Sequence, residues 1–205
     1  MILLFSATLF NLSLQAQKGS WFLGGAVGLS TGQNKEETNG NTRETGKSST
    51  WSFSPEIGHF LTDRVQAGLA ITLAGSKTDN QSNPINTIST QKSLGATIYT
   101  RYLFGKEAFR PYIGIKVSAL PGNNKTTTGS NVQEAKTFNF LANINAGFGY
   151  GISNKFTVVG SFGFLGYNLT TYKPSGSNTK YKTSSFGLDA SSLGERFNVG
   201  FYYTL

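Results

Sequence analysis

His59 is the only histidine of this 205-residue chain, and the chain contains no cysteine. A histidine acts as a general base when it stands beside a nucleophile and an acid that orients it. His59 instead comes just before a short polar segment, residues 61–64, which is predicted to be a tight turn. One histidine without cysteine does not make a dedicated transition-metal site. These residues therefore predict a protein that is not an enzyme and that holds no cofactor or metal.

Four charged residues occupy the polar phase of stretches whose other phase is apolar: Glu56, Arg101, Lys116 and Arg196. One interpretation is a gated polar path for protons or small ions. The other is a plug, in which the charges pair with one another because isolated buried charges are too costly. We favour the plug, because the alternating stretches of this chain predict an eight-stranded barrel, whose interior is too narrow for solutes.

Three lysines, Lys173, Lys180 and Lys182, fall in a polar segment, 170–183, that contains no acidic residue. The pattern predicts a surface loop that binds anions such as lipid phosphates or acidic polysaccharides, because lysine ammonium groups meet them as point charges. The alternative is a solvated loop whose lysines have no ligand.

The stretch 137–152 shows which elements position these side chains. Every second residue from Phe138 to Ile152 is apolar, whereas the residues between them are asparagine, glycine and one leucine. Successive side chains of a strand point to opposite faces, so this stretch is predicted as one strand with an apolar face and a polar or small face. At about 3.3 Å per residue it extends roughly 50 Å, which is far longer than an ordinary globular strand.

Seven further stretches repeat this alternation and are predicted as strands: 19–31, 50–60, 65–74, 93–104, 110–119, 156–169 and a last strand that ends at 205. Short turns alternate with long polar loops, which are predicted at 32–49, 75–91, 121–136 and 170–183. This order predicts an all-β chain that forms an eight-stranded antiparallel up-and-down barrel. Closure leaves no unpaired edge, which a membrane requires. An even strand number, with short turns at one end and long loops at the other, is typical of a transmembrane barrel of the outer membrane.

The last strand carries an alternating apolar face: Phe197, Val199, Phe201, Tyr203 and Leu205. Its apolar end suits insertion at the membrane, and we expect the barrel-assembly machinery to be a partner. Phe186 and Leu188 are out of phase with this face, so a bulge is predicted near 192–195.

Residues 1–17 carry no charge and read as a secretory signal peptide, which leaves 18–205 as the barrel domain. The chain has 18 basic and 10 acidic residues, a formal charge of +8. The positive charges are not clustered on a helix or in a basic arm, so no nucleic acid is expected. Phosphate-rich lipid headgroups are a suitable partner on charge alone.

Alternation does not identify the face that meets lipid, because a soluble lipocalin-like ligand-binding barrel points its apolar face inward. Gly19-Ser20-Trp21 even resembles the Gly-x-Trp of the lipocalins. In a soluble barrel, however, the other face would be rich in Lys, Glu and Asp, whereas here it is mostly Gly, Ser, Ala, Thr and Asn. Such residues suit the cramped lumen of a small membrane barrel. A need for detergent separates the two alternatives.

Four segments, 54–63, 101–104, 110–112 and 162–167, resemble the small outer-membrane β-barrel proteins of the Bacteroidetes type, often named "porin family" or "outer membrane protein β-barrel domain". The resemblance covers nearly the whole mature chain. It implies a Gram-negative outer membrane, periplasmic termini and no established reaction, and we expect the long loops to be extracellular. We expect a monomer with a structural or surface-interaction role, whose partners are outer-membrane lipid, lipopolysaccharide and a surface ligand bound by the loops.

A lipid-modifying barrel enzyme is the alternative function. Small barrel enzymes that acylate or deacylate lipid A use a histidine with a serine and an acid near the outer rim. His59 is predicted at the opposite, periplasmic end, and no convergent set of these three residue types is visible in the sequence.

Overall fold

The computed structural model of the protein describes residues 18–38, 40–82, 85–105, 108–188 and 198–205. These residues form one sheet of nine strands. The strands are β1 (Trp21–Thr38), β2 (Asn41–Phe60), β3 (Val65–Ser82), β4 (Ile85–Leu103), β5 (Phe109–Thr128), β6 (Asn131–Gly151), β7 (Phe156–Pro174), β8 (Tyr181–Leu188) and β9 (Asn198–Thr204). Within the described ranges, no helix is long and apolar enough to cross a membrane. The predicted signal peptide, 1–17, and the predicted bulge at 192–195 lie outside these ranges, so both stay predictions.

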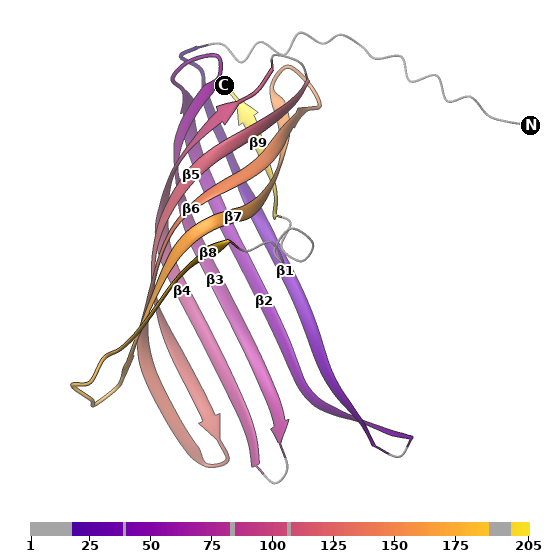
Figure 1. Ribbon diagram of the computed structural model, residues 1–205, viewed down its shortest axis with the longest axis vertical. Helices are drawn as coiled ribbons and strands as arrows, with labels where there is room; N and C mark the ends of the chain where they lie inside the picture. The colour runs from indigo at the N-terminus through magenta and orange to yellow at the C-terminus, as the bar shows by residue number, and fades with distance from the viewer. Residues whose placement is uncertain (1–17, 39, 83–84, 106–107, 189–197) are drawn as a thin grey trace, which may run out of the picture.

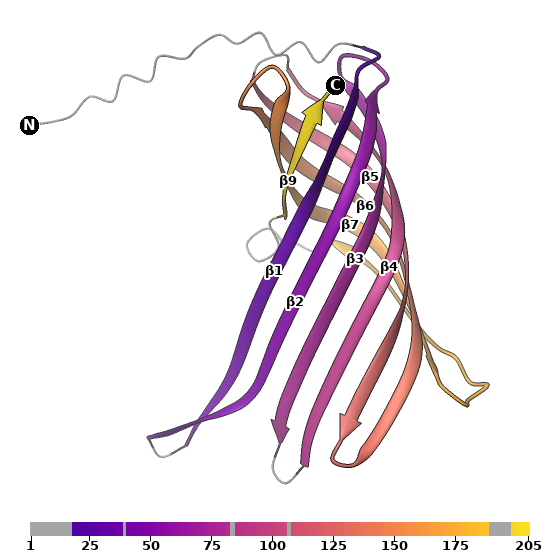
Figure 2. The same cartoon turned by 180° about the vertical axis from the view of Figure 1, so that it is seen from behind.

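The sheet closes on itself as a barrel with eight strand positions (Figure 1). From β1 to β7 each strand pairs antiparallel with the next. The eighth position is shared, because β8 pairs with residues 165–172 of β7 and β9 pairs with residues 156–161. β9 also pairs with residues 22–27 of β1 and lies beside that part of it in Figure 2. The predicted eight-stranded antiparallel barrel is therefore confirmed, with its last position built from two strands.

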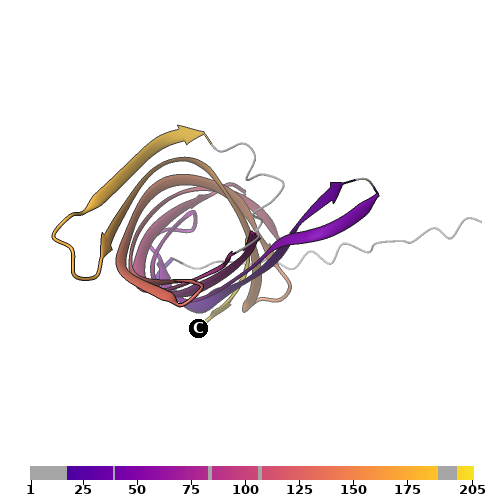
Figure 3. The same cartoon turned by 90° about the horizontal axis from the view of Figure 1, so that it is seen from below.

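The four segments predicted as long loops are paired strands for most of their length, and that prediction is wrong. β1 and β2 continue outward until Thr38 pairs with Asn41, and β5 and β6 until Thr128 pairs with Asn131. Both faces of these outer segments are polar, so they lack the alternation from which strands were predicted. We call this end of the barrel the hairpin end and the other the turn end. Seen from the hairpin end, the β1–β2 and β7–β8 hairpins lean away from the ring of the wall (Figure 3).

The apolar face of each strand points out of the barrel, as predicted. Leu69, Ile71 and Ile98 are 57 %, 56 % and 55 % exposed, and a continuous apolar surface of this kind marks a contact with lipid or a partner. On β3 the outward apolar residues run from Val65 to Leu73. This length agrees with the roughly 9–11 residues that a tilted strand needs to cross the hydrocarbon core.

One register shift between β6 and β7 was not predicted. Ile144 faces Leu165, whereas the next residue of β6, Asn145, faces Gly163. The extra residue on β7 reverses the faces of everything that follows it. The stretch 156–169 therefore does not keep one phase along its whole length, although its sequence predicts a single phase.

Candidate functional site

Two of the predicted lumen charges form an ion pair on the lumen side of the wall, over β3. Arg101 on β4 donates from Nη2 to Oε2 of Glu56 on β2 at 3.3 Å, and the two side chains are 13 % and 14 % exposed. Both residues lie in the inward phase of their strands. Their contact gives each charge a partner inside the narrow lumen, where an isolated charge would be costly.

Two tyrosines enclose the Arg101 guanidinium. Its central carbon lies 4.2 Å from the ring centroid of Tyr99 and 5.4 Å from that of Tyr112, distances at which a cation is attracted to a ring face. Each ring lies across a glycine directly opposite it on the next strand, Tyr99 across Gly68 and Tyr112 across Gly147. The inward glycines therefore make room for the rings. We call Glu56 and these three residues, Arg101, Tyr99 and Tyr112, the arginine cage.

Nearer the turn end, a second cluster fills the lumen with aromatic rings. The ring of Phe22 is fully buried and lies 4.7 Å from Tyr202 and 5.6 Å from Phe60, centroid to centroid. Gln66, also buried, donates from Nε2 to the Tyr202 hydroxyl at 3.3 Å and so links β3 with β9. We call Phe22, Phe60, Gln66 and Tyr202 the aromatic floor.

The other two predicted lumen charges do not join the ion pair. Lys116 lies directly opposite Tyr99 and shares its inward face, and among the described residues it forms no ion pair. Arg196 lies outside the described residues. Arg110, absent from the predicted set, is buried with 9 % of its surface exposed. Arg110 lies on the same face of β5 as Lys116, so its inward position can be predicted from the alternation of this strand.

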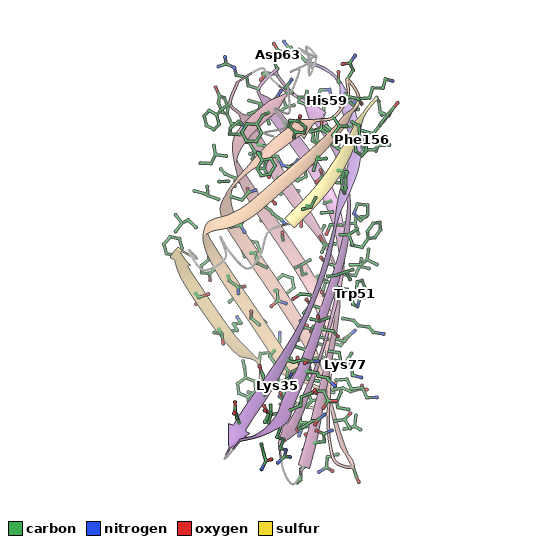
Figure 4. The ribbon with its side chains drawn as sticks, turned by 90° about the vertical axis from the view of Figure 1, so that its right-hand side faces the viewer. Lys35, Trp51, His59, Asp63, Lys77 and Phe156 are labelled. Atoms are coloured by element: carbon green, nitrogen blue, oxygen red, sulfur yellow. The ribbon has the colours of Figure 1, made fainter. Side chains whose placement is uncertain are left out.

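His59 lies on β2 at the turn end (Figure 4). Its ring packs against Trp21, with 4.8 Å between the centroids. Aromatic residues at this level are typical of the girdle at a membrane–water interface. Across the described ranges, His59 has no hydrogen bond to a hydroxyl or an acid, and no group of three His, Asp or Glu side chains could hold a metal ion.

The three lysines predicted to bind anions belong to the β7–β8 hairpin. Tyr172 and Tyr181 are direct partners near its tip, with ring centroids 6.4 Å apart. Lys182 pairs with Thr171 and therefore shares a face with Lys173, two residues further along β7. Lys180 is exposed and comes one residue before β8. The structure thus brings Lys173 and Lys182 to one face of a hairpin rather than to a loop.

Part of the predicted apolar face of the C-terminal strand is described. Phe201, Tyr203 and Leu205 are 47 %, 45 % and 62 % exposed. Phe201 stacks against Phe156 on β7 at 5.8 Å between centroids. Phe197 lies outside the described residues.

Comparisons with known proteins agree with this architecture. A family model described as "Outer membrane protein beta-barrel domain" matches residues 4–192. The outer membrane protein OprG from Pseudomonas aeruginosa is similar in structure, with a TM-score of 0.50 and 14 % identity, covering 94 % of this chain and 98 % of that one. The translocator domain of the autotransporter NalP from Neisseria meningitidis has a TM-score of 0.51 and 15 % identity, covering 85 % of this chain and 61 % of that one. At such identities the likeness shows the fold alone, and no curated protein sequence matches this chain.

Proposed function

Because the chain belongs to the outer membrane protein β-barrel domain family, we propose that it is a non-catalytic outer-membrane barrel with a closed lumen that displays its long hairpins outside the cell. The arginine cage carries this proposal. A charge pair enclosed by two tyrosine rings, Arg101 with Glu56 between Tyr99 and Tyr112, blocks the path that a solute would take.

The aromatic floor supports the same function. Phe22 and Phe60 are fully buried, and Gln66 is 1 % exposed, so the lumen is filled at a second level. Side chains fill the interior of most small barrels. The side chains that fill the lumen then make the wall rigid, and the hairpins make the contacts with molecules outside the cell.

The proposed orientation places the turn end in the periplasm and the hairpin end outside. Outer-membrane barrels extend further on the extracellular side than on the periplasmic side, and in this chain the long hairpins all fall at the end opposite the C-terminus (Figure 1). The exposed face of β9, with Phe201 and Tyr203, is then the surface offered to the barrel-assembly machinery. Two expectations stay predictions: that the protein is a monomer, and that it is of the Bacteroidetes type.

The alternative enzymatic function has no support from the geometry of His59. Its ring neighbour is Trp21, and it lies at the turn end, whereas a lipid-modifying site would lie at the outer rim. Incubation of the refolded protein with lipid A, followed by mass spectrometry of the lipid, should show no change in acyl chains. Removal or transfer of an acyl chain would contradict the non-catalytic function.

Planar-bilayer recording tests the closed lumen. The wild-type protein should give no reproducible unitary conductance. Heat-modifiable migration on SDS gels, which closed barrels show until they are boiled, identifies the folded fraction, so that a silent bilayer reports a closed barrel and not an unfolded chain. Large, reproducible conductance steps from the folded fraction would overturn the proposal.

A further inference from the structure

A row of lysines crosses the outer wall where the apolar band ends. Lys92 on β4 pairs with Asn123 on β5, which pairs with Lys136 on β6, which pairs with Lys173 on β7. Directly opposite residues share a face, and Lys136 and Lys92 have the phase of the apolar outward residues of their strands. We call Lys92, Lys136 and Lys173 the lysine row.

The lysine row lacks acidic partners. Lys136 and Lys173 stand directly opposite each other, and like charges in that position destabilise a sheet. The next outward residues toward the hairpin end add Lys77 and Lys125 on β3 and β5 and one acid, Glu134 on β6. Glu134 already contacts Lys125, with Nζ and Oε1 3.9 Å apart. At these two levels five lysines therefore face one acid, and the next acid on this face is Asp79, two residues beyond Lys77 and directly opposite Lys47. An external anion would relieve the repulsion of the lysines.

A groove lies against the lysine row and joins it to the apolar band. It is a shallow, open groove of about 480 Å³, and its lining includes Trp51, Leu73, Leu94, Pro121, Lys92 and Lys136. The indole of Trp51 lies across Gly75, its direct partner on β3, where a side chain would collide with the ring. Figure 4 places Trp51 and Lys77 at successive levels between His59 at the turn end and Lys35 at the hairpin end. The groove is thus apolar on the side of the membrane core and cationic on the side of the water.

We propose that this groove binds a phosphorylated lipid of the outer leaflet, with its phosphate on Lys92 and Lys136 and an acyl chain along Leu73 and Leu94. Strands lie about 4.8 Å apart, so the backbones of Lys92 and Lys136 are separated by roughly 10 Å. Two flexible lysine side chains extend far enough from that distance to reach one phosphate. The site lies on the barrel wall and not in the lumen, so a conducting barrel would leave it standing. Its assignment to the outer leaflet rests on the proposed orientation, with the hairpin end outside.

Tryptophan fluorescence gives a local test. The chain has two tryptophans, so Trp21→Phe leaves Trp51 in the groove as the only reporter. This protein is reconstituted in phosphatidylcholine vesicles that contain lipid A with brominated acyl chains, or the same lipid after removal of its phosphates. Phosphorylated lipid should quench Trp51 at a lower mole fraction than the dephosphorylated form. Lys92→Gln with Lys136→Gln should raise the half-saturating mole fraction about tenfold, as expected for the loss of charge-assisted contacts.

The matched control is Lys18→Gln with Lys155→Gln, which removes the same charge at the turn end and should keep the wild-type value. Equal quenching by the two lipids in the Trp21→Phe protein would overturn the proposal. So would an equal loss in the turn-end variant, since the preference would then report net charge. A loss confined to Lys180→Gln with Lys182→Gln would place the phosphate on the β7–β8 hairpin and would also overturn it.

Discussion

Glu56 on β2 and Arg101 on β4 reach each other across β3, which separates these two strands in the wall. Two side chains can meet across an intervening strand only if both lie on the same face of the sheet, and the alternation of β2 and β4 places Glu56 and Arg101 on the inward face. The ion pair therefore couples three neighbouring strands from inside the barrel. Loss of one partner leaves the other charge buried without compensation, which costs more than the pair contributes.

Glu56→Gln removes the carboxylate and keeps the shape of the side chain. Arg101 then retains its charge in a site where only 13 % of its side chain is exposed. We expect the free energy of unfolding to fall by about 1–3 kcal/mol, measured by urea unfolding in lipid vesicles with tryptophan fluorescence. The matched control is Glu134→Gln, which breaks an ion pair with Lys125 whose side chains are 57 % and 62 % exposed. That loss should stay below about 0.5 kcal/mol, and equal losses in the two variants would contradict the role given to the arginine cage.

Gly58→Ala tests the packing of the aromatic floor. Phe22 lies directly opposite Gly58, and a Cβ added there would collide with its ring. The ring is fully buried and packs against Phe60 and Tyr202, so the change should cost about 1–3 kcal/mol of unfolding free energy and lower the temperature at which the folded band disappears on SDS gels. Gly187→Ala is the control, because a Cβ there meets nothing within 4 Å. Unchanged heat resistance of Gly58→Ala would show that the floor is loosely packed.

Two neighbouring residues of β5 lie on opposite faces of the wall, one toward lipid and one toward the lumen. Ile115 is outward and 54 % exposed, whereas Lys116 faces the lumen beside Tyr99. Ile115→Arg should impair insertion by about 2–4 kcal/mol, since an arginine would meet hydrocarbon near the bilayer centre. Lys116→Arg keeps the lumen charge and should insert like the wild type. The yield of folded, protease-resistant barrel in vesicles measures both, and a reversed order would invert the assignment of the two faces.

The barrel could be predicted from the sequence wherever a strand separates lipid from lumen. β6 shows this most clearly, because its alternation from Phe138 to Tyr150 follows the contrast between hydrocarbon and a narrow interior. The contrast ends at the membrane surface, and so does the pattern. The outer parts of β1 and β2, where Thr38 pairs with Asn41, are polar on both faces, so their sequence shows no alternation and predicts a loop.

The candidate site was only partly predictable. The alternation of their strands predicts that Glu56 and Arg101 point inward. Alternation does not tell how far along the barrel axis each residue lies, so their contact could be found only from the strand registers. Lys116 has the same phase and yet forms no ion pair in the described part of the chain. The lysine row could not be read from the sequence, because Lys92 and Lys136 are far apart in the chain and meet only through the registers of β4, β5 and β6.

The β7–β8 hairpin offers a second, more exposed place for anions. Lys173, Lys180 and Lys182 have no acid within the segment 170–183. The β1–β2 hairpin carries a similar number of positive charges but neutralises them locally. Lys35 faces Glu44, Arg43 faces Glu36, and Lys47 lies 2.9 Å from the Glu44 carboxylate. Of these two hairpins, the β7–β8 hairpin therefore presents the uncompensated positive field, which reaches roughly 8 Å at physiological salt.

Replacing Lys173, Lys180 and Lys182 together with Gln should abolish salt-dependent binding of an acidic polysaccharide to the barrel in vesicles. The binding is measured by co-sedimentation across a salt series, because attraction between exposed charges weakens as salt increases. The control replaces Lys35, Arg43 and Lys47 with Gln, which removes the same formal charge from the β1–β2 hairpin. That variant should bind almost as well as the wild type, because the three cations that it loses already face or contact acids in the wild-type hairpin. If the wild type shows no salt-dependent binding, or if both triple variants lose it equally, the β7–β8 lysines are solvated residues without a ligand of this class.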